Sequence, residues 1–80
     1  MAFYTALEKQ SEDSESVTYR FGPGDGRWGL IKFDKQAREY LKLSDVPGAT
    51  HENHLEHAIL KLIRVAKAGE GFPDVLEYAA

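Results

Sequence analysis

Three histidines recur at every third position in one short segment, and imidazole nitrogens are common zinc ligands. They are His51, His54 and His57, within HENHLEH. Zinc hydrolase motifs place two histidines four residues apart, on one face of a helix. A spacing of three turns successive side chains by about 60°, so His51 and His57 would point about 120° apart. We therefore predict no metal site, with His57 solvated and His54 beside the apolar face; a weak site at His54 and either neighbour is the alternative.

A glycine-rich segment, residues 24–29 (GDGRWG), matches the G-x-G-x-x-G pattern of dinucleotide-binding proteins. In those proteins the glycines let pyrophosphate approach the N-terminus of the helix that follows. Here the following residues alternate like a strand, so no helix dipole is available. We interpret residues 22–27 as a hairpin loop, because Gly supplies positive φ and Pro fixes φ. We predict no cofactor.

Serine and carboxylate side chains show no arrangement typical of catalysis. Glu12 and Asp13, with three serines, lie in residues 10–16 (QSEDSES), where no apolar residue occurs. This composition predicts an acidic, flexible loop that would not hold catalytic groups in place. No G-x-S-x-G nucleophile motif is present. The sequence therefore does not indicate an enzyme.

The remaining residues predict strands. Alternation of apolar and polar side chains in β-favouring residue types predicts four of them, at residues 3–7, 17–21, 28–33 and 40–44. Residues 34–38 predict a turn before the last strand. Residues 34–43 also fit the spacing of a short helix, but we favour a strand because a short hairpin is the simplest connection to the strand before it.

One helix is predicted over about residues 51–68. Asn53 and Glu56 resemble a capping box, and Gly69 is a typical helix end. The predicted apolar stripe consists of Leu55, Ala58, Ile59, Leu62, Ile63 and Ala66. A short C-terminal extension, residues 70–80, follows; its residues 72–78 fit either a strand or a helical turn.

Together these elements predict one α+β domain over residues 1–80. It is a small antiparallel β-meander of about four strands, packed on one face by a single C-terminal amphipathic helix. The chain has 80 residues and no cysteine, so the apolar core has to stabilise it without disulfides or a thiolate metal site. The lack of cysteine and of a signal-peptide or membrane-spanning pattern predicts a cytoplasmic protein that does not bind a membrane.

The net charge of −3 lies in residues 1–16, because residues 17–80 hold equal numbers of acidic and basic side chains. A neutral body with an acidic flank is not typical of a nonspecific nucleic-acid binder. We therefore do not expect nucleic acid to be the partner.

The pleat of the predicted sheet divides its side chains between two faces. The face toward the helix would carry Val17, Tyr19, Phe21, Ile31, Phe33, Leu41 and Leu43. The outer face would carry Thr18, Arg20, Trp28, Leu30, Lys32, Tyr40 and Lys42. Aromatic residues interleaved with Arg and Lys are typical of binding surfaces. Alternatively, the N-terminal segment or residues 72–78 cover Trp28 and Leu30.

The leading hypothesis is a small protein-interaction module that binds a protein partner, or a second copy of itself, through this outer face. Trp28, Leu30 and Tyr40 would be the anchors, and the basic residues would orient an acidic partner. These basic residues are Arg20, Lys32 and Lys42. Two alternatives remain: stacking of single-stranded nucleic acid on the same face, and a metal protein or small enzyme that uses the histidines.

Overall fold

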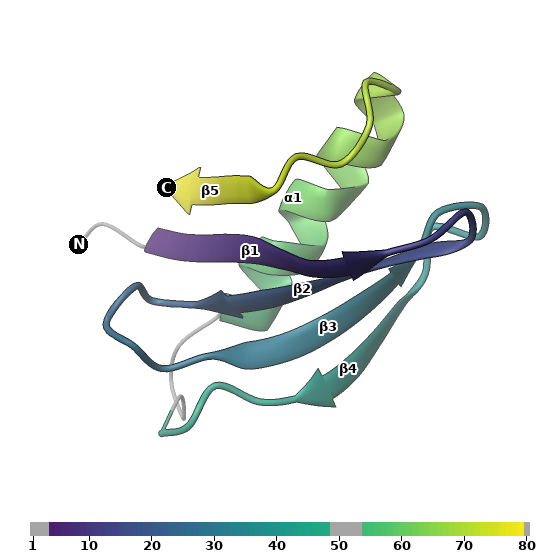
Figure 1. Ribbon diagram of the computed structural model, residues 1–80. Coiled ribbons are helices and arrows are strands. Elements are labelled where there is room, and N and C mark those ends of the chain that lie inside the picture. The colour runs from purple at the N-terminus through teal and green to yellow at the C-terminus, as the bar shows by residue number, and fades with distance from the viewer. Residues whose placement is uncertain (1–3, 49–53, 80) are drawn as a thin grey trace.

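Five antiparallel strands form one open sheet, and a single helix packs on one of its faces (Figure 1). The computed structural model describes residues 4–48 and 54–79. The strands are β1 (Tyr4–Glu12), β2 (Ser16–Gly22), β3 (Gly29–Asp34), β4 (Tyr40–Ser44) and β5 (Val75–Ala79), and the helix is α1 (His54–Ala68). The spatial order of the strands is β4-β3-β2-β1-β5. The predicted α+β class, with a meander and a C-terminal helix, is confirmed, and residues 40–44 are a strand.

The C-terminal extension forms a fifth strand. After α1 the chain returns to the sheet, and β5 pairs with β1, with Leu7 opposite Leu76. Two hydrogen bonds guide this return: the Tyr19 hydroxyl donates to the Pro73 carbonyl at 2.5 Å, and the Lys9 amide donates to the Asp74 carbonyl at 2.8 Å. Burial raises the pKa of Tyr19 to about 12, so its hydroxyl keeps the proton that it donates. The local pattern of residues 72–78 fitted either a strand or a helical turn. These long-range contacts favour the strand.

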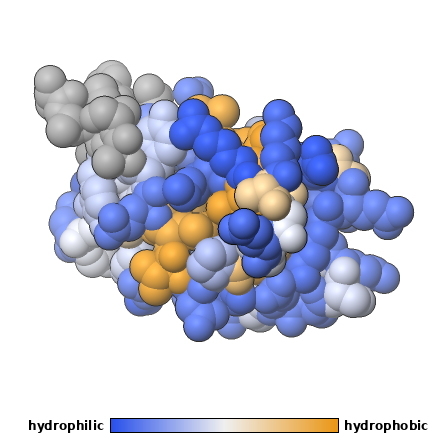
Figure 2. Space-filling view, turned by 90° about the horizontal axis from the view of Figure 1, so that it is seen from above, coloured by the Kyte–Doolittle hydropathy of each residue, from blue (hydrophilic) through white to orange (hydrophobic). Residues whose placement is uncertain are grey.

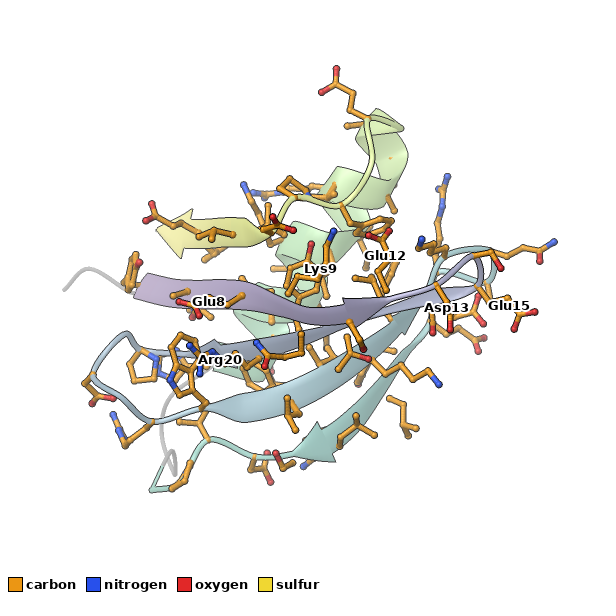
Figure 3. All side chains as sticks on the ribbon, in the orientation of Figure 1. Glu8, Lys9, Glu12, Asp13, Glu15 and Arg20 are labelled. Atoms are coloured by element: carbon orange, nitrogen blue, oxygen red, sulfur yellow. The ribbon has the colours of Figure 1, made fainter. Side chains whose placement is uncertain are left out.

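The prediction of a loop over residues 10–16 is wrong. β1 continues to Glu12 and β2 begins at Ser16, so only residues 13–15 turn. The Asp13 carboxylate accepts the backbone N–H groups of Glu15 at 2.8 Å and Ser16 at 2.7 Å, and these bonds lower its pKa. Glu12 is held by Lys35 at 2.6 Å. The segment lacks apolar residues because the hairpin extends past the helix, into solvent, and not because it is irregular (Figure 3).

The core lies between the sheet and α1. Its buried members are Leu7, Val17, Tyr19, Phe21, Ile31, Phe33, Val46, Ala58, Leu62 and Leu76. The five core residues predicted on the second and third strands are therefore confirmed. The prediction that Leu41 and Leu43 pack in this core is wrong, because their exposed fractions are 59% and 49%.

The helix ends at Ala68, where Gly69 takes a φ of +70°, a conformation that glycine adopts without strain. The predicted start, including Asn53 and its capping box with Glu56, lies outside the described residues. α1 packs mainly on β1, β5 and β2. In the described parts of the chain no helix is long and apolar enough to span a membrane.

Two leucines on α1 test whether burial against the sheet stabilises the fold. Leu62 is fully buried and Leu60 is 45% exposed. We expect Leu62→Ala to lower the free energy of unfolding by about 2–5 kcal/mol, and Leu60→Ala to change it by less than about 1 kcal/mol. Urea unfolding measures both. The substitution and the helix are the same, so helix propensity cancels, and equal losses would contradict this packing.

Candidate protein-binding surface

β4 is an edge strand that exposes every one of its residues. Half of the exposed large hydrophobic residues in the described ranges lie on it: Tyr40, Leu41 and Leu43. Most edge strands are shielded by charge, proline or a covering segment, since their N–H and C=O groups can pair with another chain. β4 contains no proline, and Lys42 is its single charged residue.

The turn before β4 sets which side chains reach each face of the sheet. The Asp34 carboxylate accepts the amides of Gln36 at 2.9 Å and Ala37 at 2.8 Å, and Arg38 takes a φ of 57°. The Asp34 N–H donates a hydrogen bond to the Glu39 carbonyl at 2.8 Å, so Glu39 lies opposite Asp34. From this pair onward, the register of β4 is determined.

That register reverses the predicted faces of β4. Phe33 lies opposite Tyr40, and Lys32 lies opposite Leu41. Directly opposite residues share a face, so Tyr40 and Lys42 lie on the helix face with Phe33. Leu41 lies on the open face, which we define as the face directed away from α1. The expectation that Tyr40 and Lys42 share a face with Lys32 is therefore wrong.

The other predicted site residues do lie on the open face. Arg20 is opposite Glu8 and Leu30, and Lys32 is opposite Thr18. The Arg20 guanidinium bonds to the Glu8 carboxylate and lies 4.2 Å from the centre of the Trp28 ring (Figure 3). Arg20 thus already covers one face of the indole.

A hollow flanks β4 on each face of the sheet. The helix-side groove has a volume of about 620 Å³ and is lined by Arg38, Glu39, Tyr40, Leu41, Lys42, Ile59 and Ile63. The open-face hollow has a volume of about 230 Å³ and is lined by Ser16, Lys32, Asp34, Glu39, Tyr40 and Leu41. The helical pattern predicted Ile59 and Ile63 only as members of the apolar stripe. They also line the groove because α1 lies near β4, and this placement cannot be read from a local sequence pattern.

The opposite edge of the sheet is less apolar. Figure 2 looks down on the end of the molecule where β5 and the C-terminal part of α1 lie, and shows a small apolar area surrounded by hydrophilic side chains. On β5, Val75 is 62% exposed and Leu76 is buried. Glu77 accepts a hydrogen bond from the Tyr4 hydroxyl at 3.3 Å. β4 is therefore the stronger candidate for a binding edge.

The histidines form a buried polar cluster with Thr5. The Thr5 hydroxyl lies 2.8 Å from Nδ1 of His54 and 3.2 Å from Nδ1 of His57. Because a hydroxyl donates only one proton, at least one of the rings carries a proton on Nδ1. The His57 ring stacks on Tyr78 with centroids 4.5 Å apart.

This cluster corrects the predicted position of His57, which is half-buried rather than solvated. His54 lies beside the apolar stripe, as predicted, and is buried on the same side of α1 as Ala58 and Leu62. His51 lies outside the described residues. In the described ranges no group of three or more metal-ligating side chains comes together. The cluster joins α1 to β1 and β5.

No protein-family model, curated protein or solved structure matches this chain. The assignment of a function therefore depends on the surface of the molecule and its chemistry.

The histidine cluster predicts a loss of stability in mild acid. Burial, and secondarily the nearby His54, lower the pKa of His57, while Glu56 acts in the opposite direction. The unfolded chain therefore binds this proton more readily than the folded one. The stabilisation is complete above the ordinary pKa of about 6.5 and is lost as the pH falls through the lower, folded-state value.

Urea unfolding between about pH 7 and pH 5, above the range in which most carboxylates titrate, measures this effect. The control is His57→Phe, which keeps an aromatic ring beside Tyr78 and removes the titrating group. We expect the pH dependence to be weaker in this variant. The same slope in both proteins would show that His57 does not cause it.

Proposed function

We propose that this protein is an interaction module whose partner contributes an extended segment that adds to β4 as a further strand. The observation that carries this proposal is the exposed edge strand β4, which has large hydrophobic side chains on both faces. Addition of a strand to a sheet edge is a common mode of peptide recognition.

The backbone of β4 supports this mode. The Asp34–Glu39 pair is hydrogen-bonded, and hydrogen-bonded pairs alternate with non-hydrogen-bonded pairs along an antiparallel ladder. Leu41 therefore directs its N–H and C=O toward β3, while Tyr40 and Lys42 direct theirs away from the sheet. No further strand pairs with β4 in residues 4–48 and 54–79.

The side chains around β4 support a segment of mixed apolar and acidic character. An added strand would send alternate side chains to opposite faces. Those on the helix face would contact Tyr40, Ile59 and Ile63 in the helix-side groove. Arg38 and Lys42 lie there too, beside Glu39, and Lys42 also pairs with Asp45. Those on the open face would contact Leu41 and Lys32.

This proposal keeps three of the six predicted contact residues: Lys32, Tyr40 and Lys42. Leu30 lies on β3, opposite Ser44, and lines neither hollow beside β4. Arg20 and Trp28 stack on each other, and Glu8 binds the Arg20 guanidinium. Their mutual contact does not favour the stacking of a nucleic-acid base on Trp28, which requires an accessible ring face.

Selection of randomised peptides displayed on phage tests the proposal, with the protein immobilised sparsely so that its copies stay apart. We expect enriched sequences that alternate apolar residues and include acidic ones. Leu41→Glu should weaken their binding on the order of tenfold or more, because it removes an apolar contact from the strand. It should also keep the fold, because the new carboxylate lies opposite Lys32.

Val75→Lys is the matched control. Val75 is equally exposed on the other edge strand, and a lysine there lies opposite Glu8. We expect this variant, and Trp28→Ala, to bind the peptides as the natural sequence does. Failure to enrich any peptide, or equal binding to Leu41→Glu, would contradict the proposal.

A further inference from the structure

We infer that the strand β4 accepts is β4 of a second copy of this chain, paired antiparallel about a twofold axis at Leu41. The inference rests on the proposed function, since it names the partner of the same edge. It follows from the faces of the β4 side chains and from the position of its one charged residue.

Symmetry restricts the possible registers. A twofold axis perpendicular to the sheet keeps every residue on its own face, and directly opposite residues must share a face. Tyr40 and Lys42 lie on the helix face, and Leu41 lies on the open face. Within the regular part of β4, the axis can therefore pass only through Tyr40, Leu41 or Lys42, with that residue opposite its own copy.

Charge separates these three registers. An axis at Lys42 places two lysines directly opposite each other. An axis at Tyr40 places the apolar Leu41 opposite Glu39 of the other copy. It also brings Lys42 toward Arg38, in the turn before β4 of that copy, so like charges again approach each other. Like charges directly opposite destabilise a strand pair. Only the register with its axis at Leu41 places no like charges opposite each other over residues 39–43.

The favoured register also pairs complementary side chains. Tyr40 of each copy lies opposite Lys42 of the other, an aromatic–cation pair within the helix-side groove. The two Leu41 side chains meet on the open face, where each is 59% exposed in the single chain. The outward N–H and C=O groups of Tyr40 and Lys42 then pair with each other across the axis.

The two sheets would become one continuous sheet, with both helices on the same face. The two helix-side grooves would adjoin at the axis, because each is lined by Tyr40 and Lys42. Dimerisation would thus remove an edge that is otherwise open to indiscriminate pairing.

Charge exchange at the axis tests this arrangement by sedimentation equilibrium over a range of concentrations. We expect the natural sequence to form a dimer, and Leu41→Glu and Leu41→Lys each to raise the dissociation constant on the order of tenfold or more, because like charges then meet at the axis. An equimolar mixture of the two variants should restore the dimer. Val75→Lys should dimerise like the natural sequence.

Amide hydrogen exchange gives a second, residue-specific readout. In the monomer the amides of Tyr40 and Lys42 face solvent and that of Leu41 faces β3. Raising the protein concentration should therefore slow exchange at Tyr40 and Lys42 and leave Leu41 unchanged. Circular dichroism of each variant checks that a lost dimer is not a lost fold.

Three results would overturn the inference: a monomer at concentrations up to about 1 mM, a dimer that survives in both Leu41 variants, or a mixture that fails to associate. A monomer that still binds selected peptides at β4 would refute self-pairing and leave the proposed function standing. A monomer that binds no peptide would refute both.

Discussion

One helix covers only part of a five-stranded sheet, and the rest of the structure depends on this constraint. α1 runs obliquely across the strands, and its C-terminal end lies beyond β5 (Figure 1). It packs mainly on β1, β5 and β2, so the side chains of β4 remain exposed and a groove is left beside the helix.

The position of the helix is determined by a polar contact as well as by apolar packing. A buried hydroxyl without a partner costs roughly 1–3 kcal/mol, and Thr5, fully buried on β1, avoids this cost by contacting His54 and His57. Tyr78 on β5 adds the stacking partner. Since these contacts lie at the β1 and β5 end, they hold α1 away from β4. The groove between α1 and β4 results from this position of the helix.

Much of the fold could be predicted from local patterns. The alternation of Val17, Tyr19 and Phe21, and the helical spacing of Ala58 and Leu62, are strong signals because each places apolar side chains on one face. The faces of β4 could not be predicted from the same rule. The alternation of apolar and polar residues placed Leu41 in the core because leucine is apolar. The register of β4 on β3 is instead determined by the four-residue turn between Asp34 and Glu39. Counting from that turn would have placed Tyr40 opposite Phe33.

The remaining errors have a related physical origin. β5 and the polar ends of β1 and β2 are strands because of pairing between distant residues, such as Leu7 with Leu76, and Lys35 with Glu12. The same non-local character governs the candidate site, whose residues come from β3, β4 and α1.

Lys42, which pairs with Asp45 at 2.9 Å, shows that the local sequence does determine where charge lies on the edge strand. A single charge on an otherwise apolar edge does not prevent pairing, but it penalises every register that opposes it with another cation. In an edge strand of this composition, the single charge therefore favours registers that keep it away from another cation.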